Sequence, residues 1–222
     1  MEKHKFLAMI IGNGLIGSAM QSVDDNDTII FASGVSDSQE ARESEFDRER
    51  ELLNNNLNKS MRLIYFSTVP KGNSRYMTHK KEMESIVEKN YNYLILRVQY
   101  IVGNGGCETN LFNILKLNLI NGSQINIFKN SYRTFFDVED LVKLVKVLKT
   151  CQGVVTVSGV EMMPVKRIVE MMATYLRVQY EIKLIDSKPE RQIANDEIID
   201  AWLYRLGIAR ENYVESVIKK YC

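Results

Sequence analysis

The feature that most constrains this chain is a glycine-rich turn directly after a short apolar run near its start. The apolar run at 6–11 leads into the sequence Gly-Asn-Gly-Leu-Ile-Gly, and an amphipathic stretch follows. Glycines at this spacing permit a tight turn between a buried strand and a helix, and they let a phosphate approach the helix N–H groups. The residues expected to bind a nucleotide are Gly12, Asn13, Gly14, Leu15, Ile16 and Gly17. The alternative is a tight turn without a ligand.

Along the rest of the chain, short apolar runs alternate with charged, amphipathic stretches, which is typical of a parallel α/β sheet flanked by helices. Strands are predicted at 6–11, 28–32, 62–67, 93–98, 125–128 and 153–157. Helices are predicted at 15–23, 40–56, 74–89, 110–119, 138–148, 164–176 and 196–206. Asp137 can cap one helix and Pro164 can begin another. Because no linker interrupts the pattern, we expect residues 1–222 to form a single domain.

Composition excludes several classes of protein. Lys and Arg number 29 and Asp and Glu number 28, so no excess charge is available to hold nucleic acid or an acidic membrane. The three cysteines, Cys107, Cys151 and Cys222, lie far apart and show neither a disulfide framework nor a metal-binding spacing. This use of cysteine favours a reducing cytoplasm. With two histidines and no apolar run long enough to cross a membrane, we predict no metal, no nucleic-acid partner and no membrane partner.

A tyrosine and a lysine four residues apart are the main candidates for chemistry. Tyr76 and Lys80 share one face of a predicted helix, and an ammonium beside a phenol lowers the pKa of the phenol. Tyr76 can then exchange a proton with a carbonyl or an alcohol near neutral pH. Ser67 and Thr68 end the preceding strand with hydroxyls that can bind the same substrate oxygen. His79 is expected on a different, solvent-facing side of the helix.

Several segments occur in an order that is specific when taken together: IIGNGLIGSAM, IIFASGVSDS, YFSTVP, YMTHK, LILRVQYIVGNGG and SYRTFFDVEDLVKLV. In this order they resemble the extended short-chain dehydrogenase/reductases, and specifically the NAD-dependent epimerase/dehydratase family that modifies nucleotide sugars. The resemblance covers nearly the whole chain. It implies a Rossmann-like parallel sheet with its core in residues 1–103, and a substrate-binding lobe with the remaining strands in 104–222.

The resemblance also implies roles for individual residues. Tyr76 is the general acid/base, Lys80 lowers its pKa and binds the nicotinamide ribose, and Thr68, with Ser67 before it, holds the sugar oxygen. NAD or NADP lies on the glycine turn, on Tyr76 and Lys80, and on the end of the second predicted strand, at Ala32, Ser33 and Gly34. The nucleotide-sugar substrate is bound by Arg133, whose family counterpart meets the diphosphate, and by Asn110 and Arg97.

The chain departs from the family pattern in length. Ile11 stands where the first glycine of the family usually lies, and the chain passes from its first helix directly to the segment that resembles the fourth strand. The second and third strands, which normally supply much of the adenine pocket, are therefore expected to be missing, with strand one near an edge. Asp37, about 20 residues after Gly17, lies beyond its strand, so we expect a loop or capping aspartate rather than a ribose ligand.

The type of reaction is only partly constrained. Val69 and Pro70 stand where a dehydratase of the family has an Asp-Glu pair, which disfavours dehydration. Epimerase and ketoreductase remain, and the trimmed adenine side slightly favours a ketoreductase with an exchangeable cofactor. A non-catalytic protein and an NAD(P)-sensing regulator are the alternatives. The family also implies polysaccharide biosynthesis and a homodimer through the helices at 40–56 and 74–89, although the charged run 40–51 is first expected to be a solvated helix with i,i+4 pairs.

Overall fold

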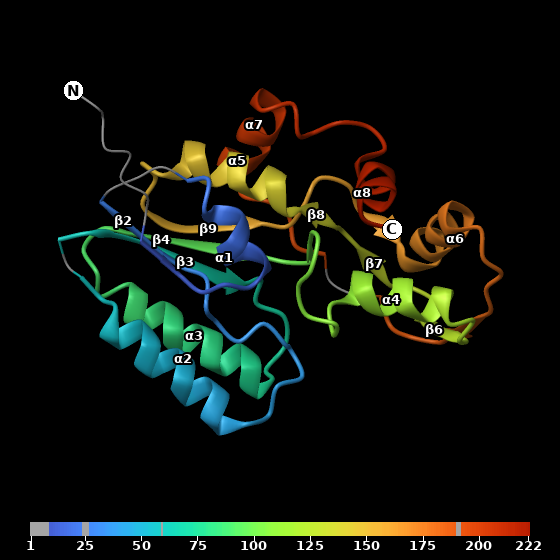
Figure 1. Ribbon diagram of the computed structural model, residues 1–222, viewed down its shortest axis with the longest axis horizontal. Coiled ribbons are helices and arrows are strands. Elements are labelled where there is room, and N and C mark those ends of the chain that lie inside the picture. The colour runs from blue at the N-terminus through green and yellow to red at the C-terminus, as the bar shows by residue number, and fades with distance from the viewer. Residues whose placement is uncertain (1–8, 24–26, 59, 190–191) are drawn as a thin grey trace. The chain divides into compact units, whose positions relative to one another are not determined.

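The computed structural model describes residues 9–23, 27–58, 60–189 and 192–222 (Figure 1). The chain divides into two compact units. The first comprises the described part of 1–98 together with 138–157, and the second comprises 99–137 and 158–222. The division predicted near residue 103 does not anticipate the return of 138–157 to the first unit. In sequence the second unit is thus an insertion into the first, followed by a C-terminal extension.

The first unit is built on a five-stranded parallel sheet in the order β1-β2-β3-β4-β9. The strands are β1 (Met9–Ile11), β2 (Thr28–Phe31), β3 (Arg62–Thr68), β4 (Tyr93–Val98) and β9 (Gly153–Val157). The three central strands consist almost entirely of buried residues, as expected where helices cover both faces. The predicted strands are confirmed to within one residue at their described ends. Residues 6–8 of the first prediction lie outside the described residues.

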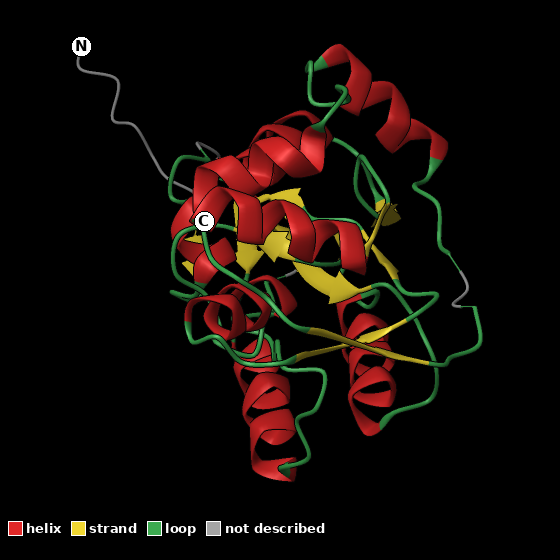
Figure 2. Cartoon of the chain, turned by 90° about the vertical axis from the view of Figure 1, so that its right-hand side faces the viewer, coloured by secondary structure: helices red, strands yellow, loops and turns green. Residues whose placement is uncertain are grey.

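Helices cover both faces of this sheet. Helices α1 (Leu15–Met20) and α5 (Val138–Leu148) pack together on one face, and α2 (Glu43–Asn55) and α3 (Arg75–Val87) pack together on the other. Figure 1 shows α5 above the sheet and α2 and α3 below it, and Figure 2 shows helices in red and strands in yellow from a view turned by 90°. The predicted shortening is confirmed, because among the described residues β1 pairs with β2 alone and forms an edge of the sheet.

The order of strands and helices requires an unusual crossover. All steps from β1 to β4 move across the sheet in one direction, yet α1 lies on the opposite face from α2 and α3. The β1–α1–β2 connection therefore has the opposite hand to the next two, and because such crossovers are almost always right-handed, we assign the left hand to β1–α1–β2. In the doubly wound order 3-2-1-4-5-6 the first helix leads to strand two. Removing strands two and three while α1 keeps its face produces this left-handed step.

The core between the sheet and α2 and α3 positions the region that carries the candidate site. Buried side chains from both helices and from β2, β3 and β4 pack there: Ile29, Phe31, Leu53, Leu63, Tyr65, Met83, Val87 and Ile95. The Ser74 hydroxyl caps α3 by accepting a hydrogen bond from the Met77 N–H at 3.2 Å. A short loop thus connects the end of β3 at Thr68 to the start of α3, so the first turn of α3 follows directly after the carboxyl end of the sheet.

The second unit contains helices and short strand pairs. Its helices are α4 (Leu111–Ile120), α6 (Val165–Leu176), α7 (Glu197–Arg205) and α8 (Tyr213–Tyr221). Its strands pair as β5 (Ile101–Val102) with β8 (Phe136–Asp137), β6 (Ile125–Phe128) with β11 (Ile182–Ile185), and β7 (Tyr132–Arg133) with β10 (Met163–Pro164). Helix α8 and all of these strands except β6 were not predicted, because two-residue strands carry no readable period.

The C-terminal helix is tied to the residue that precedes α5. The carboxylate of Asp137 accepts hydrogen bonds from Lys220 Nζ and from the Tyr221 hydroxyl, each at 2.8 Å. Pro164 stands at the N-cap of α6, as predicted. Within the described parts of the chain, no helix has both the length and the apolar character that crossing a bilayer requires.

Candidate active site

The glycine turn between β1 and α1 is built from close backbone contacts. Gly12 has φ +118°, and a Cβ at this position would lie 2.5 Å from the carbonyl oxygen of Ala32. A Cβ on Gly17 would lie 2.4 Å from the carbonyl oxygen of Gly12. Gly14, in contrast, has open space where its Cβ would be, and no side chain caps α1 there. Two of the glycines therefore let helix, turn and strand approach one another, and the third leaves the helix start open.

The segment after β2 closes over the carboxyl end of the sheet and is held by α2. Ala32 donates its N–H to the carbonyl of Ile11 at 2.8 Å, which ties the segment to the glycine turn. The carbonyl of Ser33 accepts from Arg48 at 3.2 Å, and Val35 N–H donates to Glu49 Oε2 at 2.7 Å. The structure therefore brings Ala32, Ser33 and Gly34 together with the glycine turn, as the resemblance implies.

Tyr76 and Thr68 form a hydroxyl pair where β3 ends and α3 begins. The Thr68 hydroxyl hydrogen-bonds the phenol of Tyr76, whose side chain is 6% exposed and packs against Val35 and Phe46. Burial raises the pKa of Tyr76 to about 12; the Thr68 bond acts in the opposite direction, and the charge of Glu49 adds to the rise. The pKa of Tyr76 is therefore raised in this structure, whereas the sequence pattern predicts that it is lowered.

Lys80 explains that difference, because its ammonium is already engaged. Lys80 Nζ lies 3.0 Å from Glu49 Oε1, 3.3 Å from Glu49 Oε2 and 3.3 Å from the Tyr65 hydroxyl, and its side chain is 5% exposed. A lysine ammonium has three donors, and these contacts use them all. The centroid of the Tyr76 ring lies 5.8 Å from Nζ. Lys80 is thus a member of a buried ion pair rather than a free donor beside the tyrosine.

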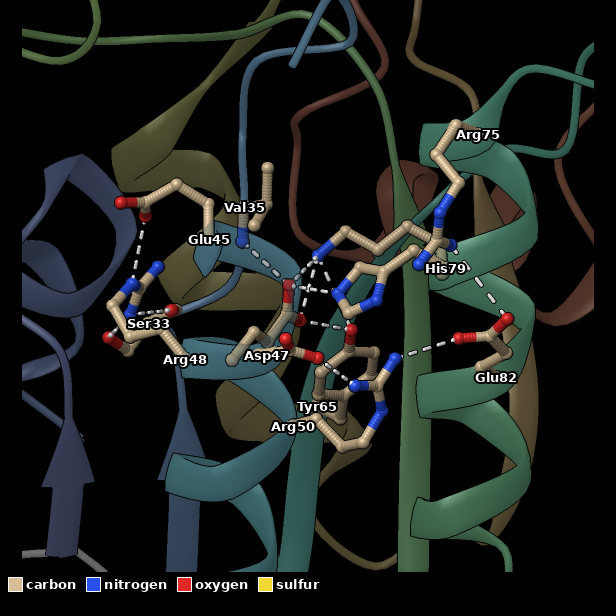
Figure 3. Close-up of polar contacts among 12 residues, drawn as sticks. Ser33, Val35, Glu45, Asp47, Arg48, Arg50, Tyr65, Arg75, His79 and Glu82 are labelled. Carbon is tan, nitrogen blue, oxygen red and sulfur yellow. Dashed lines mark hydrogen bonds and ion pairs between the residues drawn. The ribbon is translucent and has the colours of Figure 1, made fainter. Parts of the chain in front are cut away.

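Glu49 is the centre of this cluster, and Figure 3 labels three of the residues that contact it, Val35, Tyr65 and His79. Besides Lys80, its carboxylate accepts hydrogen bonds from the Val35 N–H at 2.7 Å, from the Tyr65 hydroxyl at 2.6 Å and from His79 Nε2 at 2.9 Å. Burial alone would raise the pKa of Glu49, but Lys80, His79, Tyr65 and Val35 together lower it to about 2. The carboxylate is therefore ionised at neutral pH although its side chain is fully buried.

Two predictions about this cluster are wrong. His79 was expected at the surface, but its side chain is fully buried, and its Nδ1 has no hydrogen-bond partner among the described residues. The run 40–51 was expected to be solvated, which holds for most of the helix but not for Glu49. The spacing of Phe46, Glu49 and Leu53 contains the missed signal, since these residues share one helix face and all three are buried. A carboxylate on an apolar helix face predicts a buried partner.

Three other candidates make contacts that differ from their expected roles. The Ser67 hydroxyl donates to Glu84 Oε1 at 2.5 Å, and Arg97 binds both oxygens of the same carboxylate, at 2.9 and 2.5 Å. The side chain of Asn110 caps α4 by accepting from the Phe112 N–H at 3.0 Å, while its amide donates to a backbone carbonyl. Within their own units, these side chains stabilise the fold rather than present free groups to a substrate.

Arg133 and Asp37 make local contacts within their own units. The guanidinium of Arg133, in the second unit, lies over the ring of Tyr100 at 5.3 Å and donates to the carbonyl of Tyr132 at 2.7 Å. Asp37 accepts a hydrogen bond from the Gln39 N–H at 2.8 Å in the loop before α2, so it is a loop aspartate and does not cap a helix. Cys107 is exposed.

Comparisons with known proteins give the fold a wider context. No family model and no curated protein sequence matches this chain. Among solved structures, the chain is similar to dTDP-4-dehydrorhamnose reductase from Bacillus anthracis in complex with NADP, with a TM-score of 0.66 and 17% identity, covering 88% of this chain and 78% of that one. It is also similar to dTDP-glucose 4,6-dehydratase from the same organism in complex with NAD, with a TM-score of 0.65 and 15% identity, covering 87% and 70%.

A third similar structure is UDP-glucuronic acid 4-epimerase from Bacillus cereus in complex with UDP-glucuronic acid and NAD, with a TM-score of 0.65 and 16% identity, covering 87% of this chain and 73% of that one. All three solved chains are longer than the part matched here, which agrees with the missing strands beside β1. The chain therefore has the Rossmann-type α/β fold of NAD(P)-dependent nucleotide-sugar reductases, dehydratases and epimerases, in a shortened form.

Proposed function

We propose that this protein is an NAD(P)-dependent oxidoreductase or epimerase that acts on a nucleotide-linked sugar, with ketoreduction preferred. The observation that carries the proposal is the hydrogen-bonded pair of Thr68 and Tyr76 at the carboxyl end of β3, next to the segment after β2. In open α/β sheets, ligands bind at the carboxyl ends of the strands. A hydroxyl pair at that edge is suited to hold a substrate oxygen and to exchange a proton with it.

The first unit fits a dinucleotide at its phosphates. Gly14 leaves open space at the uncapped start of α1, and Gly12 and Gly17 hold the turn close to Ala32, so phosphate oxygens can approach backbone N–H groups. When bound, the nicotinamide supplies or accepts a hydride. The expected contact of Lys80 with the nicotinamide ribose does not fit, because Glu49 and Tyr65 engage the ammonium.

Tyr76 can serve a reduction as the proton donor. With its pKa raised to about 12, Tyr76 is a neutral phenol at physiological pH and holds a proton that it can donate to a carbonyl oxygen. Thr68, hydrogen-bonded to the same phenol, can hold that oxygen. For the substrate we propose Arg133 as the ligand of the diphosphate, since a guanidinium pairs well with phosphate oxygens. A homodimer through α2 and α3 and a role in polysaccharide biosynthesis stay predictions.

A second candidate is an NAD(P)-binding protein that does not turn over a substrate. The Lys80–Glu49 ion pair favours it, because the lysine expected to activate the tyrosine is neutralised. Both candidates predict dinucleotide binding, and turnover separates them.

The test combines binding and turnover on the full chain. Calorimetry measures the binding of NAD⁺, NADH, NADP⁺ and NADPH, and a panel of 4-keto nucleotide sugars is assayed with the reduced forms. We expect binding of at least one dinucleotide, turnover of at least one keto sugar, and a loss of turnover of about 100-fold or more in Tyr76→Phe, since acid–base catalysis contributes about that much. Dinucleotide affinity in this variant should stay within about threefold, because the phenol oxygen makes none of the phosphate contacts.

The binding and turnover assays together distinguish the two candidate functions. Binding with turnover supports the enzyme, and binding without turnover supports the second candidate. Absence of both binding and turnover would contradict the two together. Full activity in Tyr76→Phe would remove the proposed role of the hydroxyl pair.

A further inference from the structure

We propose that residues 33–35, which we call the cover, close over Tyr76 and open locally, and that a substrate oxygen reaches the phenol from the opened form. The opening would be the step that admits the substrate to the hydroxyl pair, so its meaning rests on the proposed function. The experiment that tests the opening uses neither substrate nor dinucleotide. Its failure is therefore distinguishable from failure of the proposed function.

The cover and two helices leave a substrate little access to Tyr76. The residue is 6% exposed, and its side chain packs with Val35, Phe46 and Met77. A proton donor must come within about 3.2 Å of the atom that accepts the proton. Thr68, in contrast, is half-buried, so one hydroxyl of the pair reaches the surface while the other residue lies beneath the cover.

Of the three apolar residues that pack on Tyr76 in this cluster, Val35 alone lies outside a helix. Phe46 belongs to α2 and Met77 belongs to α3, and these two helices pack on each other. Segments without regular secondary structure open at a lower free energy than the helices and strands of a core. Exposure of Tyr76 without unfolding of a helix therefore requires movement of the cover.

Few polar contacts hold the cover closed. The Val35 N–H donates to Glu49 Oε2 at 2.7 Å, a contact drawn in Figure 3, and the carbonyl of Ser33 accepts from Arg48, whose side chain is 43% exposed. Beyond the cover, the turn at 37–40 is closed by hydrogen bonds among its own residues. The contacts of the cover can therefore break without the loss of a hydrogen bond inside the sheet or a helix.

Gly34 lets the closed cover lie against the buried ion pair. A Cβ on Gly34 would lie 2.6 Å from Lys80 Nζ and 2.8 Å from Glu49 Oε1. The two side chains of the pair are 5% and 0% exposed and hold each other in place, so neither has free space into which to withdraw. The closed position of the cover thus depends on a residue without a side chain.

The first measurement is native-state hydrogen exchange of the ligand-free full chain, labelled with ¹⁵N, in urea concentrations below the unfolding transition. The amide of Val35 is compared with those of Ile64 and Phe66 in the central strand β3, each corrected for its intrinsic rate. We expect Val35 to exchange about 100-fold faster or more, with little dependence on urea, because a local opening exposes little surface. Exchange of the β3 amides should accelerate with urea.

The second measurement links the opening to position 76. The thiol introduced by Tyr76→Cys is alkylated in the folded chain, and Met83→Cys, a fully buried position on the same helix, is the matched control. Peptide mass spectrometry separates both positions from the three native cysteines. We expect labelling at position 76 to be about 100-fold faster than at position 83 and as insensitive to urea as the exchange of Val35, because position 83 is exposed only by global unfolding.

Local opening at both positions supports the proposal. Exchange of Val35 that matches Ile64 and Phe66 in rate and urea dependence would overturn it, because the cover would then open only when the chain unfolds. Fast exchange of Val35 with labelling at position 76 no faster than at position 83 would also overturn it, since the cover would move without exposing that position. If Tyr76→Cys does not fold, the hydrogen exchange of the wild type decides alone.

Discussion

The buried Lys80–Glu49 pair makes a quantitative prediction about stability. Glu49 has its pKa lowered from 4.5 to about 2 in the folded protein. A difference of about 2.5 pKa units corresponds to about 3 kcal/mol of folding free energy at neutral pH. Replacing Lys80 by methionine leaves a buried carboxylate without its cation, a change that costs about 3–5 kcal/mol in comparable pairs. In a domain of marginal stability this is a large fraction of the total.

The pH dependence follows from the direction of the shift. Because the folded-state pKa of Glu49 is lowered, its contribution is fully present above the unfolded value of 4.5 and is lost as the pH falls toward 2. The wild type should therefore lose about 3 kcal/mol between pH 6 and pH 2 from this group alone. Glu49→Gln should lack that component, since an amide does not titrate.

The assay is urea denaturation followed by circular dichroism, at pH 7 and at lower pH, on the wild type, Glu49→Gln, Lys80→Met and the double variant. At pH 7 we expect each single variant to be destabilised by about 3–5 kcal/mol and the double variant by much less than their sum, because neutral side chains leave no unpaired buried charge. Additive losses in the double variant, or equal pH dependence in the wild type and Glu49→Gln, would refute the reasoning.

The remaining predictions use contacts elsewhere in the first unit. Gly17→Ala should abolish dinucleotide binding in calorimetry and lower the melting temperature, because its Cβ would lie 2.4 Å from a backbone oxygen, whereas Gly14→Ala has open space and should fold normally. Ser67→Ala should lower stability by about 1–3 kcal/mol in denaturant titrations, because it leaves the buried carboxylate of Glu84 short of a donor. Thr68→Val should instead reduce turnover with little change in the melting temperature, and the reverse pattern in these two variants would contradict the assigned roles.

The left-handed β1–α1–β2 crossover is the structural consequence of the two missing strands. A connection of this hand is rare because the twist of a strand normally directs the chain the other way. Here α1 packs against α5 on the face it would occupy in a doubly wound sheet, while β1 pairs with β2 at the edge. Packing of α1 on α5 and the glycine contacts to Ala32 thus outweigh the preference for a right-handed step.

Local sequence patterns were sufficient for most of the elements of the first unit. Apolar runs of Ile, Leu, Val and Phe predict buried parallel strands, and the observed bounds of β2, β3, β4 and β9 agree to within one residue. The shortened sheet was also predictable, since the distance along the chain from the glycine turn to the next strand leaves no room for two more strands. Such features depend on residues close together in the chain, where side-chain periodicity and turn chemistry act directly.

The charge environment of the candidate site could not be predicted from local sequence patterns. A tyrosine and a lysine four residues apart predict an activated phenol, but the state of that phenol depends on Glu49, which lies 31 residues before Lys80 in the chain. Only the packing of α2 on α3 brings the carboxylate to the ammonium, buries both, and draws in Tyr65 and His79. Ionisation follows from burial and from partners distant in sequence, so the sequence determines which groups are present, and the tertiary structure decides which of them are charged, neutralised or free to react.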